Sequence, residues 1–201
     1  MGESGARRAD LTVAGWSQLH YGIDPARVPL LTSWLRLVWT LARPVRRVPP
    51  LVFTVLGPTF AICAIFLDPW PALALVLVAV LCDALDGAVA VMAERTSTLG
   101  AIADKVADRI ADTAFALVIW QCGAPLWLAL PAAALSFAHE AIRELFRGRA
   151  LAHITVAERP SRVICTVLAC ATAGLGAWAP TLCAAVWVAL AIVGLVQVTR
   201  A

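Results

Sequence analysis

Apolar residues recur along this chain in stretches of about 20, separated by short polar or proline-containing segments. A helix of about 20 residues is about 30 Å long, which matches the hydrocarbon core of a bilayer. Repeated stretches of this length are typical of membrane helices rather than of a soluble domain of this size. The pattern predicts an all-α polytopic membrane protein whose six transmembrane helices cover residues 50–67, 71–93, 97–120, 124–145, 160–178 and 181–199.

A shorter apolar segment, residues 30–43, precedes these six. Its apolar positions cover a broad helical face, and Arg36 and Arg43 lie between them. The segment is too short and too charged to span a bilayer. It is predicted to be an N-terminal amphipathic helix in the cytoplasmic interface, anchored by Trp34 and Trp39. A short seventh hydrophobic segment is the alternative.

The composition and the placement of charges predict the orientation of the chain in the membrane. The chain has 201 residues, of which 61% are hydrophobic and 14% charged, with a net charge of +3. The predicted connections around Asp68, 121–124 and 179–180 contain no Lys or Arg, whereas the opposite side is rich in arginine. The positive-inside rule therefore predicts a multi-pass protein of the cell inner (plasma) membrane with both termini in the cytoplasm. We expect a polar N-terminal extension over 1–29, uncleaved because it lacks the apolar core of a signal peptide, and a membrane domain over 30–201.

Five aspartates lie within or beside the second and third predicted helices. Asp83 and Asp86 are three residues apart on one helical face, and Asp104, Asp108 and Asp112 follow at intervals of four on another. An aspartate at bilayer depth costs about 2.5 to 3.5 kcal/mol, and the few nearby basic residues cannot compensate five. Carboxylate oxygens are the ligands that Mg²⁺ and Mn²⁺ prefer. Because a tight turn joins the two helices, the first four of these aspartates are predicted to bind one or two divalent cations.

Two alternative roles of the aspartates remain open. They could form buried ion pairs with neighbouring basic residues, or they could line the cation or proton pathway of a small transporter. Broken helices near the bilayer midplane would favour transport. Here the carboxylates cluster at the cytoplasmic end instead.

The run from Asp83 to Asp108 resembles the signature of the CDP-alcohol phosphatidyltransferases, D-x2-D-G-x2-A-R-x8-G-x3-D-x3-D, with the same spacing throughout. The resemblance covers roughly residues 30–200, because the six-helix layout after an interfacial helix is also similar. Residues 158–162 read E-R-P-S-R and look like the E-R-P-x-R segment of the bacterial phosphatidylinositol-phosphate synthase branch, which the chain resembles most.

The resemblance implies a metal-dependent transfer of a phosphatidyl group from CDP-diacylglycerol to a hydroxyl acceptor, with release of CMP, in phospholipid biosynthesis. Two Mg²⁺ or Mn²⁺ ions on the four aspartates would hold the donor pyrophosphate, and Asp108 would also act as the general base. Gly87 and Ser97 match positions that contact the CDP group. Thr54 belongs to a segment similar to one that covers the nucleotide.

The chain departs from the family pattern at two positions. Val91 stands where the signature has arginine, and Leu51 stands where a family motif has asparagine. Arg95 lies four residues after Val91 on the same helical face and is predicted to take over the nucleotide contact. A non-catalytic membrane homologue that keeps the fold is therefore an alternative to an active enzyme.

Arginines cluster between the fourth and fifth predicted helices. This bias agrees with the positive-inside rule and with contacts to anionic membrane lipids. A sharper interpretation is a pocket for the phosphate of a small anionic acceptor, formed first by Arg159 and Arg162 and then by Arg143. Inositol phosphate is the preferred acceptor and glycerol phosphate the alternative. No nucleic-acid partner is expected, and a homodimer is implied by the family alone.

The remaining polar residues of the fourth predicted helix receive structural interpretations. Glu140 and Glu144 are predicted to pair locally with Arg143 or Arg147, which lie at helical spacing from them. His139 is interpreted as an ordinary polar residue, because the sequence offers it no partner.

Overall fold

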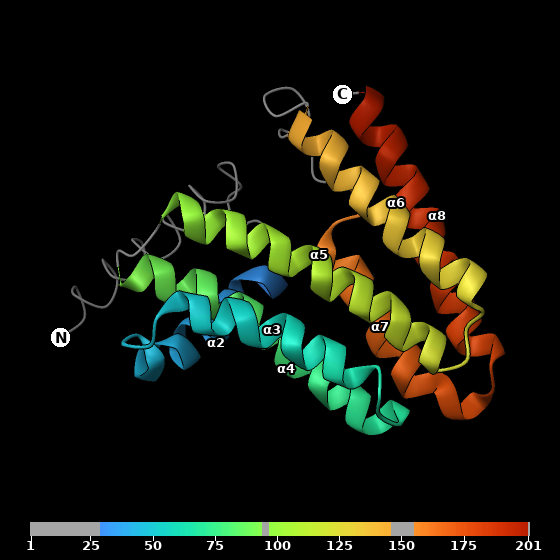
Figure 1. The fold of residues 1–201 in the computed structure, drawn as a ribbon, viewed down its shortest axis with the longest axis horizontal. Helices are drawn as coiled ribbons and strands as arrows, with labels where there is room; N and C mark the ends of the chain where they lie inside the picture. The colour runs from blue at the N-terminus through green and yellow to red at the C-terminus, as the bar shows by residue number, and fades with distance from the viewer. Residues whose placement is uncertain (1–28, 94–96, 146–154, 201) are drawn as a thin grey trace.

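The computed structural model describes residues 29–93, 97–145 and 155–200, and these residues contain helices and no strand (Figure 1). The all-α prediction is confirmed, and each predicted membrane segment has a helical counterpart. The predicted N-terminal extension lies, except for its last residue, outside the described residues. The elements in chain order are α2 (Pro29–Val45), α3 (Pro50–Ala64), α4 (Pro69–Met92), α5 (Thr98–Gln121), α6 (Leu126–Leu145), α7 (Arg159–Thr172), the 3-10 helix η3 (Ala173–Leu175) and α8 (Trp178–Arg200).

Proline marks the start of several helices. Pro50, Pro69 and Pro160 all occupy the first turn of their helices, where the missing N–H has no intrahelical partner to lose. Ser97 caps α5, since its side chain accepts a hydrogen bond from the Gly100 N–H at 3.0 Å. These local signals fix the helix starts around the cluster of aspartates.

The last turn of the chain lies earlier than predicted. The sequence placed it at 179–180, but α7 already ends at Thr172 and α8 begins at Trp178. Gly176 makes the turn with φ of 106°, a left-handed conformation that glycine adopts without strain. Pro180 lies in the first turn of α8, where proline is tolerated, so it does not break the helix.

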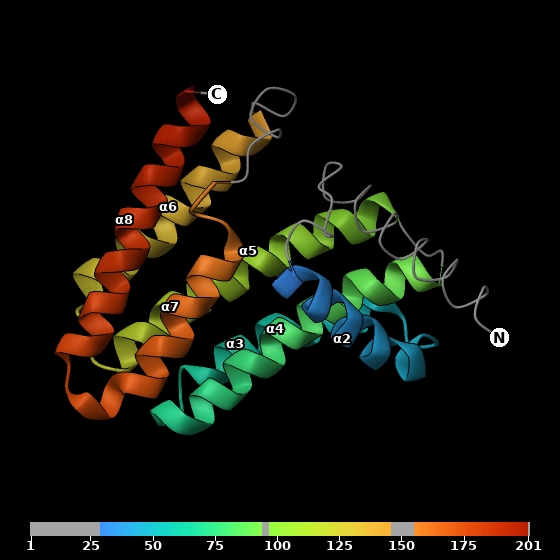
Figure 2. The same ribbon diagram turned by 180° about the vertical axis from the view of Figure 1, so that it is seen from behind.

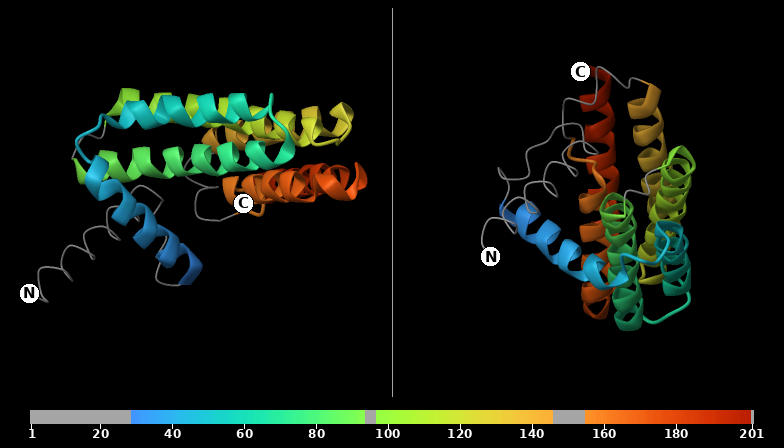
Figure 3. Two further views of the ribbon diagram at one scale, coloured as in Figure 1. Left: turned by 90° about the horizontal axis from the view of Figure 1, so that it is seen from below. Right: turned by 90° about the vertical axis from the view of Figure 1, so that its left-hand side faces the viewer.

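Small side chains dominate the interface between the helices. Most members of the main buried cluster are alanines, and the large residues Phe115 and Trp187 fill the space between them. Such small residues let helix backbones approach closely, which favours helix association in a bilayer, where the hydrophobic effect does not drive it. Helices α3, α4 and α5 run side by side, while α7 lies between α4 and the pair α6 and α8 (Figures 2 and 3). The N-terminus of α7 therefore meets both α4 and α5.

Helix α2 leaves the bundle at a steep angle (Figure 3). Its part from Arg36 to Val45 makes an angle of 116° with α3. Val38 and Ala42 are buried against α4, whereas Trp34 and Leu37 are exposed. The helix is thus amphipathic, with its buried face on the end of α4 that carries the aspartates.

The six-span count is not confirmed by helix length and composition. Among the described residues, α4 and α8 are long and apolar enough to cross a membrane, and the bent pair α2–α3 is a third if it counts as one span. Helix α7 has only 14 residues, and α5 carries five charged side chains. These helices are consistent with a membrane protein, and the number of six spans stays a prediction.

Candidate active site

Three of the predicted metal-binding aspartates meet where the C-terminal half of α4 faces the N-terminal half of α5. One carboxylate oxygen from each of Asp83, Asp104 and Asp108 lies within 4.8 Å of the other two, and all three residues are partly buried. Asp83 comes from the C-terminal half of α4, and the other two are one turn apart on α5. The prediction that the turn brings these two helical faces together is therefore confirmed for three of the four carboxylates.

The fourth carboxylate, Asp86, lies outside this group of three. It is only 6% exposed and lies near Thr54 of α3, whose hydroxyl donates to the Pro50 carbonyl oxygen at 3.3 Å. Its Oδ2 atom is buried and has no hydrogen-bond partner among the described residues. A buried carboxylate oxygen without a partner is costly, so Asp86 is a candidate metal ligand.

Arg159, the first residue of α7, reaches directly into the group of three. Its Nη1 donates to Asp83 Oδ1 at 2.6 Å and also to Asp108 Oδ1. The three side chains are between a fifth and a third exposed. One guanidinium nitrogen thus lies between two of the carboxylates, one from each aspartate-bearing helix.

Arg162, one turn further along α7, has a different environment. It is 1% exposed, and its Nε and Nη2 atoms donate to the Ala157 carbonyl oxygen at 3.2 and 2.8 Å. Its Nη1 donates to Asp112 Oδ2 at 2.5 Å, and its Nη2 to Glu140 Oε1 at 2.9 Å. These contacts join α5, α6 and α7, and they do not support the prediction that Arg162 faces an acceptor phosphate.

Arg143 is also bound to a protein partner. Its Nη1 donates to both carboxylate oxygens of Glu158 at 2.7 Å. Glu158 in turn accepts hydrogen bonds from the N–H and hydroxyl of Thr155, whose Oγ1 is 3.0 Å from Nε2 of the fully buried His139. This chain of contacts fixes the segment before α7, and sequence reasoning missed it because the contacts join residues on separate elements.

The glutamates of α6 form ion pairs with other helices. Glu140 binds Arg162, and Glu144 binds Lys105 of α5 at 2.9 Å. Arg147 lies outside the described residues. Arg143 binds Glu158 and not the two glutamates of its own helix in the described contacts, and the predicted pairing with Arg147 stays a prediction.

The predicted donor-binding residues that the structure describes lie on α3, on α4 and at the start of α5. Gly87 is exposed, and a Cβ atom placed on it would meet no described atom within 4 Å, so helix packing does not require a glycine there. Ser97 is exposed at the start of α5, where its hydroxyl caps the helix. Arg95 lies outside the described residues. Gly87 leaves a bare backbone surface one residue after Asp86, as close approach of a ligand would require.

A comparison with known protein families identifies the family of this chain. The family model described as CDP-alcohol phosphatidyltransferase matches residues 38–199, which is most of the chain and includes every aspartate discussed above. The chain belongs to the CDP-alcohol phosphatidyltransferase family. Members of this family are membrane enzymes of phospholipid biosynthesis that transfer a phosphatidyl group from a CDP-alcohol to an alcohol acceptor, and they use a divalent metal. No curated protein matches the chain in a direct comparison.

The donor atoms of this phosphatidyltransferase fit a divalent cation. Three carboxylate oxygens lie close enough together to share an ion, and Asp86 adds a buried oxygen one turn along α4 from Asp83. All are hard oxygen ligands, the type that Mg²⁺ and Mn²⁺ select. The residues present therefore suit the metal that the family uses.

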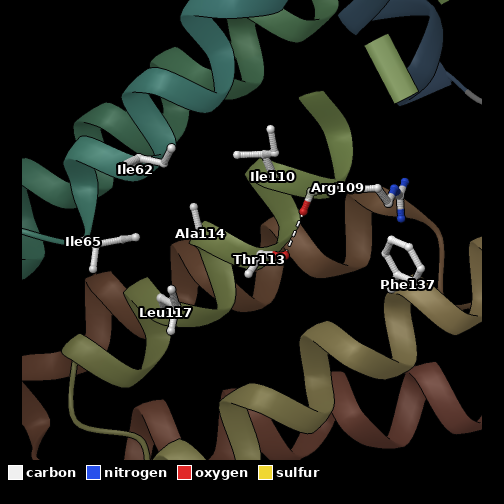
Figure 4. A pocket seen from close by; sticks show the side chains of 8 residues that line it. All are labelled: Ile62, Ile65, Arg109, Ile110, Thr113, Ala114, Leu117 and Phe137. Carbon is white, nitrogen blue, oxygen red and sulfur yellow. Dashed lines mark hydrogen bonds between the residues drawn. The ribbon is translucent and has the colours of Figure 1, made fainter. Parts of the chain in front are cut away.

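An apolar groove runs along the opposite face of α5 (Figure 4). Ile110, Thr113 and Leu117 lie on this face, roughly half a helical turn from the aspartates. The Thr113 hydroxyl donates to the Arg109 carbonyl at 2.8 Å, and the Arg109 side chain lines one end of the groove together with Phe137. The groove belongs to α3, α5 and α6 and is separate from the carboxylates of the phosphatidyltransferase site.

Proposed function

We propose that this phosphatidyltransferase uses CDP-diacylglycerol as donor and inositol phosphate as acceptor, and that it releases CMP. Glycerol phosphate is the alternative acceptor. The observation that carries the proposal is the meeting of Asp83, Asp104 and Asp108 beside an arginine in a chain that belongs to this family. Carboxylates on one side and a guanidinium on the other suit a reaction between two phosphate-bearing substrates.

Two ions, Mg²⁺ or Mn²⁺, on Asp83, Asp86, Asp104 and Asp108 would neutralise the charge of the donor pyrophosphate. Support comes from the closeness of three carboxylates and from the buried Asp86 oxygen, which has no hydrogen-bond partner in the part of the chain that the structure describes. We assign contacts with the nucleotide portion to the exposed backbone at Gly87, the hydroxyl of Ser97 and the side chain of Thr54. Arg95, outside the described residues, is assigned the same role from the sequence alone.

Asp108 is proposed as the general base. Its carboxylate would take the proton of the acceptor hydroxyl, the acceptor oxygen would attack the β-phosphorus of the donor, and CMP would leave. A base must lie within hydrogen-bond reach of the proton it removes. The Asp108 side chain is partly exposed beside the other two carboxylates, so a hydroxyl can approach it.

Arg159 is the best-placed of the three arginines proposed to bind the acceptor phosphate. It is 21% exposed and lies beside the proposed base. Arg143 and Arg162 would join it only by giving up Glu158, Asp112 or Glu140. We therefore assign phosphate binding first to Arg159 and keep the other two as supporting residues behind it.

The proposed setting is the bacterial inner membrane, with helices α3 to α8 as six spans and both termini in the cytoplasm. The steep angle and amphipathic surface of α2 support its placement in the cytoplasmic interface. The donor acyl chains would stay in the bilayer while the water-soluble acceptor enters from the cytoplasm. A homodimer is part of the proposal on family grounds alone.

The test is CMP release by the purified full-length protein in detergent with CDP-diacylglycerol, Mg²⁺ or Mn²⁺, and a panel of alcohol acceptors. We expect release only with inositol phosphate, loss of release with a chelator, and a fall of at least about a hundredfold in Asp108→Asn. Asp68→Asn is the matched control, because Asp68 is exposed at the other end of α4 and makes no capping hydrogen bond. The proposal would be contradicted by CMP release at the same rate with and without an acceptor, or by an undiminished rate of release in Asp108→Asn.

A further inference from the structure

The contacts of Arg159 overlap with the candidate metal ligands. Its Nη1 donates to one oxygen each of Asp83 and Asp108, and both residues belong to the group of three carboxylates that could hold an ion. A cation bound to these carboxylates and the guanidinium would repel each other at contact distance. The two positive charges therefore cannot share these oxygens without a loss in affinity.

The Arg159 side chain can also move while its backbone stays in place. Among the described residues, its side-chain hydrogen bonds go to Asp83 and Asp108, and the side chain is 21% exposed. Arg162, on the next turn, is held by a carbonyl and two carboxylates and anchors the start of α7. A long side chain on a fixed helix start can swing from one partner to another without moving the helix.

We infer that Arg159 is an internal competitor of the divalent cation, which releases it from Asp83 and Asp108 to bind the acceptor phosphate. The inference rests on the proposed function for the last step only. It makes metal and acceptor binding cooperative, since the metal frees the residue that the acceptor needs. By linkage, an acceptor that binds Arg159 tightens metal binding by the same factor as the metal tightens acceptor binding.

The test measures Mn²⁺ binding to the full chain in detergent, from the electron paramagnetic resonance signal of free Mn²⁺, with no donor or acceptor present. We expect Arg159→Gln to bind Mn²⁺ about tenfold more tightly than the natural protein, within the usual range of coupling between two sites. Arg200→Gln is the control, because it removes the same charge from an exposed arginine in the last turn of α8. It should change the affinity less than about twofold.

Unchanged or weaker Mn²⁺ binding in folded Arg159→Gln would overturn the inference, and weaker binding would show that the arginine organises the carboxylates instead. Arg159→Lys decides the question if the glutamine variant does not fold, since a shorter cation should compete less well and also tighten binding. No increase in that variant overturns the inference as well. Because neither substrate is present, failure of the proposed CMP release and failure of this competition are separate results.

Discussion

Replacing Arg162 with methionine should destabilise the protein strongly. Methionine keeps much of the volume and length of the arginine stem but removes four hydrogen bonds, two to Ala157 and one each to Asp112 and Glu140. Asp112 is 3% exposed, so its carboxylate would stay buried after its closest cationic partner is gone. Loss of one member of a buried ion pair costs more than the pair itself contributes, because the remaining charge is uncompensated.

The size of this destabilisation depends on which partners and how much solvent contact Asp112 and Glu140 keep in the variant. Removing one partner of a buried pair typically costs about 3 to 5 kcal/mol. Asp112 keeps Arg109 at 3.4 Å, and the Glu140 side chain is 27% exposed to solvent, so we expect the lower end, about 3 kcal/mol. At about 2 to 4 °C per kcal/mol for a chain of this size, the melting temperature should fall by about 6 to 12 °C.

Thermal unfolding in detergent, followed by tryptophan fluorescence, measures this change. Lys105→Met is the control, because it breaks a 2.9 Å ion pair with Glu144 in which both side chains are about half exposed. An exposed pair contributes about 0 to 1 kcal/mol, so the control should melt within about 4 °C of the natural protein. A melting temperature of Arg162→Met no lower than that of the control would refute the reasoning.

Two further changes test the packing of α8. Gly194→Ala should destabilise the protein by about 1 to 3 kcal/mol and lower its melting temperature by several degrees, because a Cβ atom there would lie 2.3 Å from the Ala157 Cβ. Gly174→Ala is the control and should have little effect, because a Cβ atom there would have nothing within 4 Å. Trp187→Phe should cost about 1 to 3 kcal/mol, since it removes the 2.8 Å hydrogen bond from Nε1 to Ser136 and leaves a buried hydroxyl unpaired. A double variant with Ser136→Ala should recover part of that loss in the same unfolding assay, and strict additivity would contradict this account of the hydrogen bond.

Hydrophobic length was enough to predict where the helices lie. Their starts agree with the structure to within about three residues, because proline and a capping serine mark most of them. The failure at the last turn has a local reason. Pro180 is the stronger helix breaker by residue type, yet proline is compatible with a first helical turn, and the turn depends on Gly176 instead.

Spacing within one helix predicted the aspartate group, but it could not assign the arginines. Asp104 and Asp108 share a face because they are four residues apart, and a tight turn brings Asp83 to them. Arg159 and Arg162 are one turn apart and look equivalent in the sequence. Their aspartate partners lie 50 or more residues away, so only the packing of α7 against α4 and α5 separates their environments.

That separation gives the two arginines of α7 opposite consequences for the enzyme. A fully buried guanidinium with protein acceptors on all sides cannot exchange partners without leaving charges unpaired, so Arg162 contributes to stability and to the position of the helix. A partly exposed guanidinium on two carboxylates that a metal also prefers can exchange partners at low cost, because solvent and a substrate phosphate can replace them. Because Arg162 holds the start of α7 in place, Arg159 can exchange partners without moving the helix. If α7 could shift with Arg159, loss of its aspartate contacts would move the whole helix start, and the guanidinium would no longer remain next to Asp108 when the acceptor arrives.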